Sequence, residues 1–173
     1  RRSGAAALVD AAAEPDRLLE LADALGVVSV FETHGHWDHV GALDDLRRSG
    51  RSVWVHPDDR TLFPSFDQLF HHDQVLVVGE LRVRVIHTPG HTPGSTSFFV
   101  EGTPILLSGD TLFPGGPGAT SFEGGDFPTI IKSIDERLFR RFGDHVLVLP
   151  GHGAPTTIGV EREHLDDWVA RGW

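Results

Sequence analysis

Four potential metal ligands occur within six consecutive residues in the first quarter of the chain. The stretch 33–41 reads Thr-His-Gly-His-Trp-Asp-His-Val-Gly and contains His34, His36, Asp38 and His39. His34 and His36 are two residues apart, so in an extended segment their side chains leave on one face and can hold the same ion. Asp38 and His39 follow where the chain turns into a helix. This change of direction lets them point at a second, adjacent ion.

Three further candidate ligands, each next to a glycine, follow apolar strands later in the chain: His91, Asp110 and His152. A tight turn at the end of a strand is where a rigid sheet delivers side chains to a shared site. The seven candidates suit two divalent ions with about four to five ligands each, when one carboxylate and one hydroxide bridge the ions. The sequence therefore predicts a dinuclear metal site.

The seven candidates divide into two sets with one shared residue. We assign His34, His36 and His91 to one ion and Asp38, His39 and His152 to the other, with Asp110 as the bridge. A water held between two cations roughly 3.5–4 Å apart gives hydroxide near neutral pH. Because the chain has no cysteine, the site must be built from nitrogen and oxygen ligands. Two zinc ions are the first expectation, with iron or manganese as alternatives.

Each candidate ligand also has a plain structural interpretation. Asp38 could cap the following helix by accepting a hydrogen bond from the amide of Val40 or Gly41. His91 could be a turn residue between two Pro-Gly turns, and His152 could merely end a strand in a glycine corner. The metal site is favoured because all candidates fall at strand-to-turn junctions and together complete one ligand count.

The loop that follows Asp110 is the candidate substrate-binding segment. Such a loop can offer backbone amides and hydroxyls to a substrate, and its plain alternative is a connection. The predicted contacts are Phe113, Gly115, Gly116, Thr120 and Ser121. We expect Trp37, between the ligands, to act as a packing plug for the turn. Surface or capping roles are expected for the remaining histidines, which are His56, His71, His72, His87, His145 and His164.

The elements that must position these residues can be read from apolar periodicity. Strands are predicted at 5–10, 27–31, 52–55, 75–78, 81–86, 97–100, 105–108 and 146–149. Helices are predicted from Pro15 to Leu25, from Val40 to Ser49, and over 129–142 and 161–173. Residues 61–72 have no clear pattern, and 113–125 are glycine-rich and irregular. The first half thus reads βαβαβ, and the second half contains a β-rich meander.

Composition limits the classes of partner. The chain has 173 residues and a net charge of -10, so we expect one domain over residues 1–173 that binds neither nucleic acid nor a membrane. No run of 18 apolar residues exists, and we expect a cytoplasmic protein that acts on a small molecule. The oligomeric state is not predicted. Because methionine is absent, an N-terminal piece is expected to be missing or removed by processing.

The motif order resembles that of a known family. The turn His34-x-His36-x-Asp38-His39, followed by Gly-His91, Gly-Asp110-Thr and Gly-His152-Gly, is similar to the metallo-β-lactamase superfamily, and within it to the glyoxalase II-like hydrolases. The resemblance runs from about residue 5 to about residue 159. It implies the α/β (α+β) class, a four-layer αβ/βα sandwich, a dinuclear site at one edge, and the matching residues as metal ligands. One or two strands that usually come first in the family are missing here.

The resemblance also implies an activity. We expect a dinuclear metal hydrolase, similar to hydroxyacylglutathione hydrolase, in which metal-bound hydroxide attacks the carbonyl of a small thioester. Asp38 and Asp110 are the catalytic candidates, because they hold the nucleophile and Asp38 can take its proton. The alternatives are a lactonase or other ester hydrolase of the same fold, and a mononuclear non-haem iron persulfide dioxygenase that uses His34, His91 and Asp110. A non-enzymatic metal-binding module is a further alternative.

Overall fold

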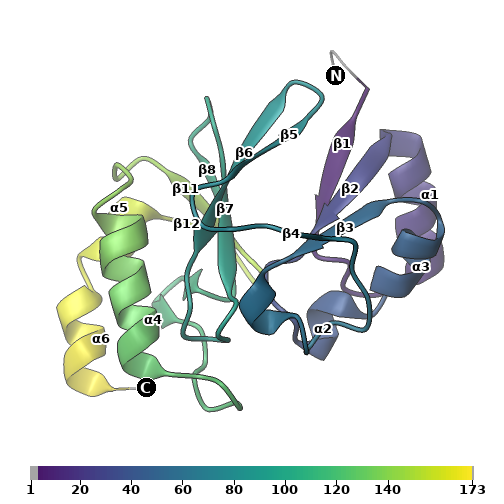
Figure 1. The fold of residues 1–173 in the computed structure, drawn as a ribbon. Helices are drawn as coiled ribbons and strands as arrows, with labels where there is room; N and C mark the ends of the chain where they lie inside the picture. Colours follow the sequence, from purple (N-terminus) through teal and green to yellow (C-terminus); the bar gives the residue numbers. More distant parts are fainter. Residues whose placement is uncertain (1–3, 173) are drawn as a thin grey trace.

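The computed structural model describes residues 4–172, and two β-sheets form its centre. The sheets face each other, and helices cover the outer face of each, so the fold has four layers (Figure 1). The first sheet has the strand order β1-β2-β3-β4, and the second has the order β12-β11-β8-β7-β6-β5. The four-layer sandwich predicted from the sequence is confirmed.

The first sheet is entirely parallel and comes from the first half of the chain. Its strands are β1 (Ala6–Val9), β2 (Val27–Phe31), β3 (Ser52–Val55) and β4 (Gln68–Leu69). The connecting helices are α1 (Pro15–Leu25), α2 (Trp37–Val40), α3 (Leu43–Arg48) and the 3-10 helix η1 (Pro57–Asp59). α1 ends as predicted at Gly26, whose φ of 70° is left-handed and whose amide bonds to the carbonyls of Ala22 and Asp23.

The second sheet is mixed, because β8 and β11 are parallel and the other neighbours are antiparallel. Its strands are β5 (Val75–Val78), β6 (Leu81–His87), β7 (Thr96–Val100), β8 (Ile105–Gly109), β11 (Leu147–Pro150) and β12 (Thr156–Thr157). Its outer face carries α4 (Phe127–Ser133), the π-helix η2 (Ile134–Phe139), α5 (Ile158–Arg162) and α6 (Leu165–Arg171), as Figure 1 shows for the labelled helices.

Three clusters of buried side chains fill the spaces between the layers. One, which includes Val30 and Leu43, lies under α1 and α3. A second joins the two sheets through residues such as Phe31 and Phe98, whose ring centroids are 5.8 Å apart. The third, which includes Ile134 and Leu106, lies between the second sheet and its helices. Burial of these apolar surfaces supplies the main force that holds the layers together.

Several predicted bounds were wrong. The helix expected over 129–142 begins earlier, because the side chain of Asp126 caps it by accepting a hydrogen bond from the amide of Thr129 at 2.8 Å. The helix expected over 161–173 is divided into α5 and α6, and its last residue, Trp173, lies outside the described residues. Glu161, in α5, is buried, and its carboxylate accepts a hydrogen bond from the amide of Gly115.

The segment 113–125 is also more regular than expected. Two short strands, β9 (Leu112–Phe113) and β10 (Gly116–Pro117), pair there in an antiparallel hairpin. The helix expected from Val40 consists of two pieces, α2 and α3. Within residues 4–172, no helix combines the length and the apolar character that crossing a membrane requires.

Candidate metal centre

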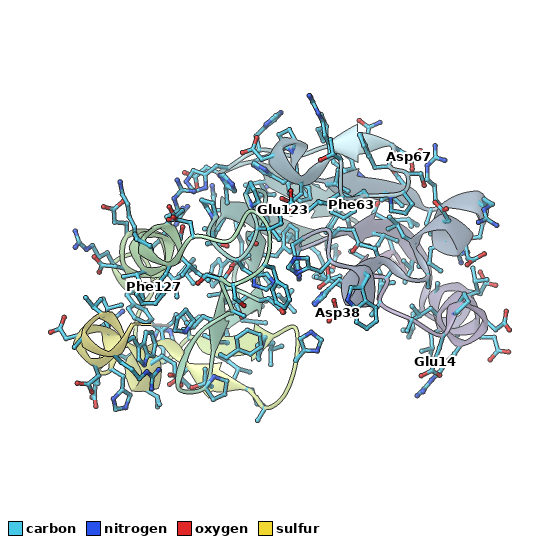
Figure 2. All side chains as sticks on the ribbon, turned by 90° about the horizontal axis from the view of Figure 1, so that it is seen from below. Glu14, Asp38, Phe63, Asp67, Glu123 and Phe127 are labelled. Carbon is cyan, nitrogen blue, oxygen red and sulfur yellow. The ribbon has the colours of Figure 1, made fainter. Side chains whose placement is uncertain are left out.

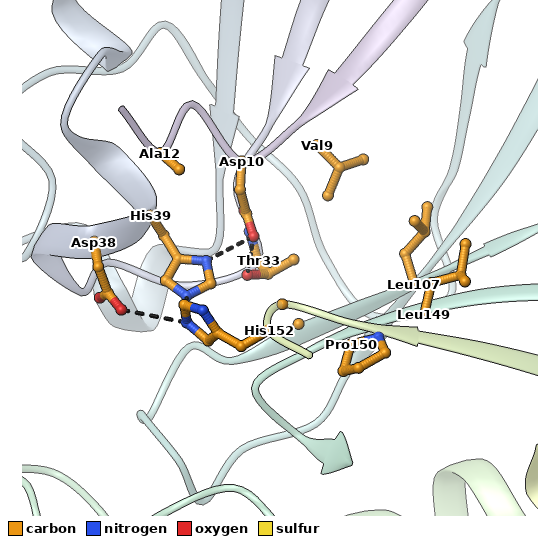
Figure 3. Close-up of a pocket in the computed structure, with 12 residues that line it drawn as sticks. Val9, Asp10, Ala12, Thr33, Asp38, His39, Leu107, Leu149, Pro150 and His152 are labelled. Atoms are coloured by element: carbon orange, nitrogen blue, oxygen red, sulfur yellow. Dashed lines mark hydrogen bonds and ion pairs between the residues drawn. The ribbon is translucent and has the colours of Figure 1, made fainter. Parts of the chain in front are cut away.

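The first four predicted ligands lie in the turn after β2, which holds His34 and His36, and in α2, which holds Asp38 and His39. Asp10 holds this turn in place. β1 pairs Val9 with Phe31 of β2, so Asp10, one residue further along, reaches the turn. Its carboxylate accepts hydrogen bonds from the amide and the hydroxyl of Thr33 at 2.7 and 2.8 Å. It also bonds to Nδ1 of His39 at 2.8 Å (Figure 3). That bond directs Nε2 of His39 toward the other predicted ligands.

The other three predicted ligands follow strands of the second sheet. His91 lies in the loop after β6, Asp110 directly follows β8, and His152 follows β11. β8 and β11 run parallel, so Asp110 and His152 leave the sheet at the same edge. A Cβ atom on Gly151 would collide with Oδ1 of Asp110 and lie 2.8 Å from Cε1 of His39, so a larger residue there would displace the side chains of two predicted ligands.

These elements bring all seven predicted ligands into overlapping groups whose ligand atoms lie within 4.8 Å of one another. The groups are His34, His36 and His91; Asp38, His39 and His152; and His34, His39 and Asp110. The first two groups are the two sets assigned from the sequence. In the view from below, Asp38 lies between the two halves of the fold (Figure 2).

Asp110 contacts histidines of both sets. Its Oδ1 lies 3.5 Å from Nε2 of His39, and its Oδ2 lies 3.7 Å from Nε2 of His91 and of His152. Nε2 of His152 is also 3.3 Å from Oδ2 of Asp38 (Figure 3). Asp110 therefore lies between the two sets of histidines. In the described chain, the group that contains Asp110 and two histidines is His34, His39 and Asp110, so His39 stands where the dioxygenase alternative expects His91.

Several of these atoms are buried without a hydrogen-bond partner. In the part of the chain that is described, such atoms include Nε2 of His34, Nε2 of His91 and Oδ1 of Asp110. Leaving a buried polar atom unpaired costs about 1–3 kcal/mol. Nδ1 of His91 donates to the carbonyl oxygen of Ala119 at 2.6 Å, so the unprotonated Nε2 faces the other ligands. Converging, unpaired nitrogen and carboxylate oxygen atoms fit a divalent ion such as zinc or iron.

Burial sets the protonation of the group. It lowers the pKa of His34 far below the ordinary value and lowers the pKa of His91 to about 4. Both rings are therefore neutral near pH 7, which is the form that binds metals. Burial raises the pKa of Asp110. It also acts to lower the pKa of His39, but the hydrogen bond and charge of Asp10 raise that pKa above its ordinary value.

Two cavities border the predicted ligands. One of about 300 Å³ is lined by Asp10, Thr33, Asp38, His39, Gly151 and His152, together with apolar residues of β1, β8 and β11 (Figure 3). The other, of about 210 Å³, is lined by His36, Trp37, Asp38, His91, Asp110 and Phe122, and we call it the aromatic cavity. A small molecule can therefore approach either set of ligands.

The loop after Asp110 meets the site through residues that the sequence did not single out. Besides the carbonyl of Ala119, the ring of Phe122 reaches His36, with ring centroids 5.4 Å apart. The amide of Gly115 donates a hydrogen bond to the carboxylate of Glu161 at 2.8 Å. The five predicted substrate contacts line neither cavity, and their role in binding stays a prediction: Phe113, Gly115, Gly116, Thr120 and Ser121.

The structure overturns one expectation about the turn and one alternative. Trp37 is 84% exposed and therefore does not plug the turn, because its neighbours direct their side chains inward and leave the ring outside. The capping alternative for Asp38 also fails for Gly41, since the amide of Gly41 donates to the carbonyl of Ala12 at 2.9 Å. α2 has no side-chain cap. The carboxylate of Asp38 is thus available to the metal site.

His56 and His87 differ from the surface role expected for them. His56 is 6% exposed, and its ring stacks on that of His87 with centroids 3.9 Å apart and planes 16° apart. Nδ1 of His56 accepts a hydrogen bond from the amide of Asp58, which is the capping role expected. The two rings and Asp58 form a further group of potential ligands. Stacked rings, however, direct their nitrogen lone pairs side by side and not at one ion.

Sequence reasoning missed two carboxylates that hold the ligand loops, Asp10 and Asp59. Asp59 is fully buried and accepts hydrogen bonds from the amide of Gly35 at 3.3 Å, the hydroxyl of Thr92 at 2.6 Å and the amide of Gly94 at 2.6 Å. The position of Asp10 at the end of a strand parallel to β2 was the available signal. For Asp59 no local signal exists, because its partners are distant in sequence.

The chain is similar to known metal-dependent enzymes. The sequence profile described as "Metallo-beta-lactamase superfamily" matches residues 1–152. The probable metallo-hydrolase YqgX of Bacillus subtilis (strain 168) is 34% identical over 156 residues, which cover 79% of this chain and 73% of that protein. The hydroxyacylglutathione hydrolase GloC of Haemophilus influenzae is 33% identical in an alignment of 179 positions, and the match covers 91% of this chain and 84% of that protein.

Solved structures share the architecture. The BLEG-1 B3 metallo-β-lactamase superposes with a TM-score of 0.87 at 28% identity, over 95% of this chain and 88% of that one. TTHA1623, whose structure is of a di-iron-bound form, superposes with a TM-score of 0.79 at 29% identity, over 89% of this chain and 85% of that one. Bound metal in a protein of this similarity agrees with the ligand groups described above.

Proposed function

The chain belongs to the metallo-β-lactamase superfamily, and on this premise we propose that it is a dinuclear metal-dependent hydrolase that cleaves acyl bonds, with small thioesters as its substrate class. Its resident ions are two divalent cations, zinc in the first place and iron or manganese as alternatives. Hydroxyacylglutathione hydrolase, the name of the GloC relative, denotes hydrolysis of a thioester and supports this substrate class.

The arrangement of Asp110 carries the proposal. Its two oxygens lie 3.5 and 3.7 Å from histidine nitrogens of different ligand sets, and its Oδ1 is buried without a hydrogen-bond partner. A single ion would leave one of the two sets without a function, whereas two ions would use both. His34, His36 and His91 would hold one ion, and Asp38, His39 and His152 the other, with Asp110 between them.

Divalent ions in such a site act as Lewis acids and lower the pKa of water to near neutrality. The residues of this chain have separate tasks around that chemistry. The side chain of Asp110 is 12% exposed and is placed to fix the reacting groups. The side chain of Asp38 is 34% exposed and lines both cavities, so it can take a proton from a bound water and pass it to solvent.

The first experiment compares His36→Ala and Asp110→Ala with the wild type on thioester, ester, lactone and β-lactam substrates. Both variants are expected to lose more than about a hundredfold in kcat/KM, because replacing even an outer partner of a ligand costs about 10–100-fold. Metal content of each protein is measured in parallel. His145→Ala and Glu80→Ala, which remove an exposed histidine and an exposed acid, are the matched controls.

Unchanged rates in a variant that has lost its metal would refute the proposal. Wild-type protein that contains one iron per chain and consumes oxygen with a persulfide would instead establish the dioxygenase alternative. Protein that binds metal but cleaves none of the substrates would support a non-enzymatic module.

A further inference from the structure

The aromatic cavity is lined by two exposed aromatic side chains. Trp37 is 84% exposed and Phe122 is 58% exposed. Among the large hydrophobic side chains exposed in the described chain, these two are the aromatic ones, and the others are Leu or Val. Both line the same cavity of about 210 Å³ beside His36 and His91. Exposed apolar groups gathered at one hollow usually mark a binding site.

Phe122 is held in this position by the chain on both sides of it. The carbonyl of Ala119, three residues earlier, accepts a hydrogen bond from His91 at 2.6 Å. The amide of Gly125 donates to the carbonyl of Phe122 at 2.9 Å, and the amide of Asp126 donates to the carbonyl of Gly90 at 2.8 Å. The loop is therefore fastened to the loop that carries His91. The ring of Phe122 lies beside the predicted ligand His36 and belongs to none of the three core clusters.

Trp37 lines the cavity from α2, which follows the turn after β2. It is the first residue of α2 and lies between the ligands His36 and Asp38. The imidazole of His36 therefore has an exposed aromatic residue next to it in the chain, and the ring of Phe122 against it in space at 5.4 Å. A flat or bulky apolar group bound here would lie beside the ligands of one ion.

No cationic side chain lines this cavity. Its lining consists of histidines, aspartates and the two aromatic residues, with neither lysine nor arginine. The neighbouring cavity of about 300 Å³ also has neither. The chain as a whole has a net charge of -10. Carboxylate groups on a carrier thiol would therefore find no cationic side chain among the residues that line these cavities.

We propose that Trp37 and Phe122 form a subsite for an aromatic or large apolar acyl group of the ester or thioester that is cleaved. The inference rests on the acyl hydrolase function proposed above. The aromatic walls bind the acyl group next to the metal ligands, so its carbonyl is presented to the reacting centre.

The test uses two thioesters of the same uncharged thiol, N-acetylcysteamine, that carry a phenylacetyl or an acetyl group. Trp37→Ala and Phe122→Ala are each expected to lower the ratio of kcat/KM for phenylacetyl over acetyl by about tenfold, mainly through KM. Trp37→Phe is expected to retain most of the ratio, because it keeps a ring. Val160→Ala removes an exposed apolar side chain elsewhere and serves as the control with an unchanged ratio.

Binding of the products tests the subsite without turnover. Titration of zinc-loaded protein is expected to show tighter binding of phenylacetate than of acetate, and Trp37→Ala is expected to remove most of the difference. If the wild type hydrolyses neither thioester, the proposed hydrolase function fails, and this titration still decides on the subsite. Equal binding of both acids by the wild type, or an unchanged preference in both alanine variants, would overturn the inference.

Discussion

At the scale of single residues, two carboxylates outside the ligand sets determine how firmly the ligand loops are held. Asp59 joins the turn that contains Gly35 to the loop that contains Thr92 and Gly94. Burial raises its pKa, while the hydrogen bonds from Thr92 and Gly94 act to lower it. Asp10 supports the other set through Nδ1 of His39. Asp59 thus supports loops of the first set, whereas Asp10 contacts His39 of the second set directly and reaches His34 of the first set only through the hydroxyl of Thr33, which lies 3.0 Å from Nδ1 of His34.

This separation gives a prediction of selective metal loss. Asp59→Asn is expected to weaken binding of the ion held by His34, His36 and His91 by about 10–100-fold, and to leave the other ion unaffected. The reason is that an amide nitrogen cannot accept the hydrogen bonds that a carboxylate oxygen accepts. Titration of metal-free protein with Zn²⁺ against a chromophoric chelator measures both affinities.

The matched variant is Asp10→Asn, for which the larger loss of affinity is expected at the other ion. It would weaken the ion held by Asp38, His39 and His152, because Oδ2 of Asp10 bonds to His39 and to the hydroxyl of Thr33. Equal losses at both ion sites in both variants would mean that these carboxylates merely stabilise the fold.

At the scale of elements, the ends of β3 and β6 come together at the stacked rings of His56 and His87. Burial, and after it the neighbouring ring of His87, lower the pKa of His56 from 6.5 to about 4. The other groups that act on His56 are Asp58, His71 and Arg137. His56 therefore binds a proton at a higher pH in the unfolded chain than in the native state. As the pH falls below 6.5, protonation of the unfolded chain favours unfolding.

The pH dependence of unfolding should reveal this contact between the sheets. From about pH 7 to about pH 5, the wild type is expected to lose about 2 kcal/mol more of its unfolding free energy than His56→Gln does. Urea unfolding at the two pH values measures the difference, with His145→Gln as the control for an exposed histidine. Equal losses in wild type and His56→Gln would mean that His56 is protonated at the same pH in both states.

The elements that carry the ligands could be predicted, because their signals are local. The run 27–31 is apolar and β-branched, and a glycine stands next to His91, Asp110 and His152 in the following turns. Each end of each predicted strand lies within about one residue of the observed end. The order of the motifs then brought seven ligand positions to one edge of the sheets.

What the sequence could not indicate depends on contacts between distant segments. Asp59 and Gly94 are 35 residues apart, and Asp10 and Thr33 are 23 apart. The exposure of Trp37 follows from which face α2 turns outward, and a helix of four residues has too short a pattern to reveal that face. The two-residue strands β4, β9, β10 and β12 likewise exist only because a neighbouring strand offers hydrogen bonds.

At the scale of the whole molecule, the predicted ligands connect the two halves of the sandwich. His34, His36, Asp38 and His39 follow a strand of the first sheet, and His91, Asp110 and His152 follow strands of the second. The apolar cluster around Phe31 and Phe98 joins the sheets independently of any metal. The fold should therefore survive removal of metal, but with lower stability.

Chelation is expected to lower the melting temperature on the order of 10 °C. A ligand present at about 1,000 times its Kd stabilises the native state by about 4 kcal/mol, and each kcal/mol shifts the melting temperature of a protein this size by about 2–4 °C. Calorimetry with and without EDTA measures the shift. His36→Ala, which weakens one ion site, should respond less to EDTA than the wild type, because less of its stability comes from bound metal. An identical melting temperature before and after complete metal removal would contradict the prediction, since ligands drawn from both sheets cannot bind an ion tightly without also holding those sheets together.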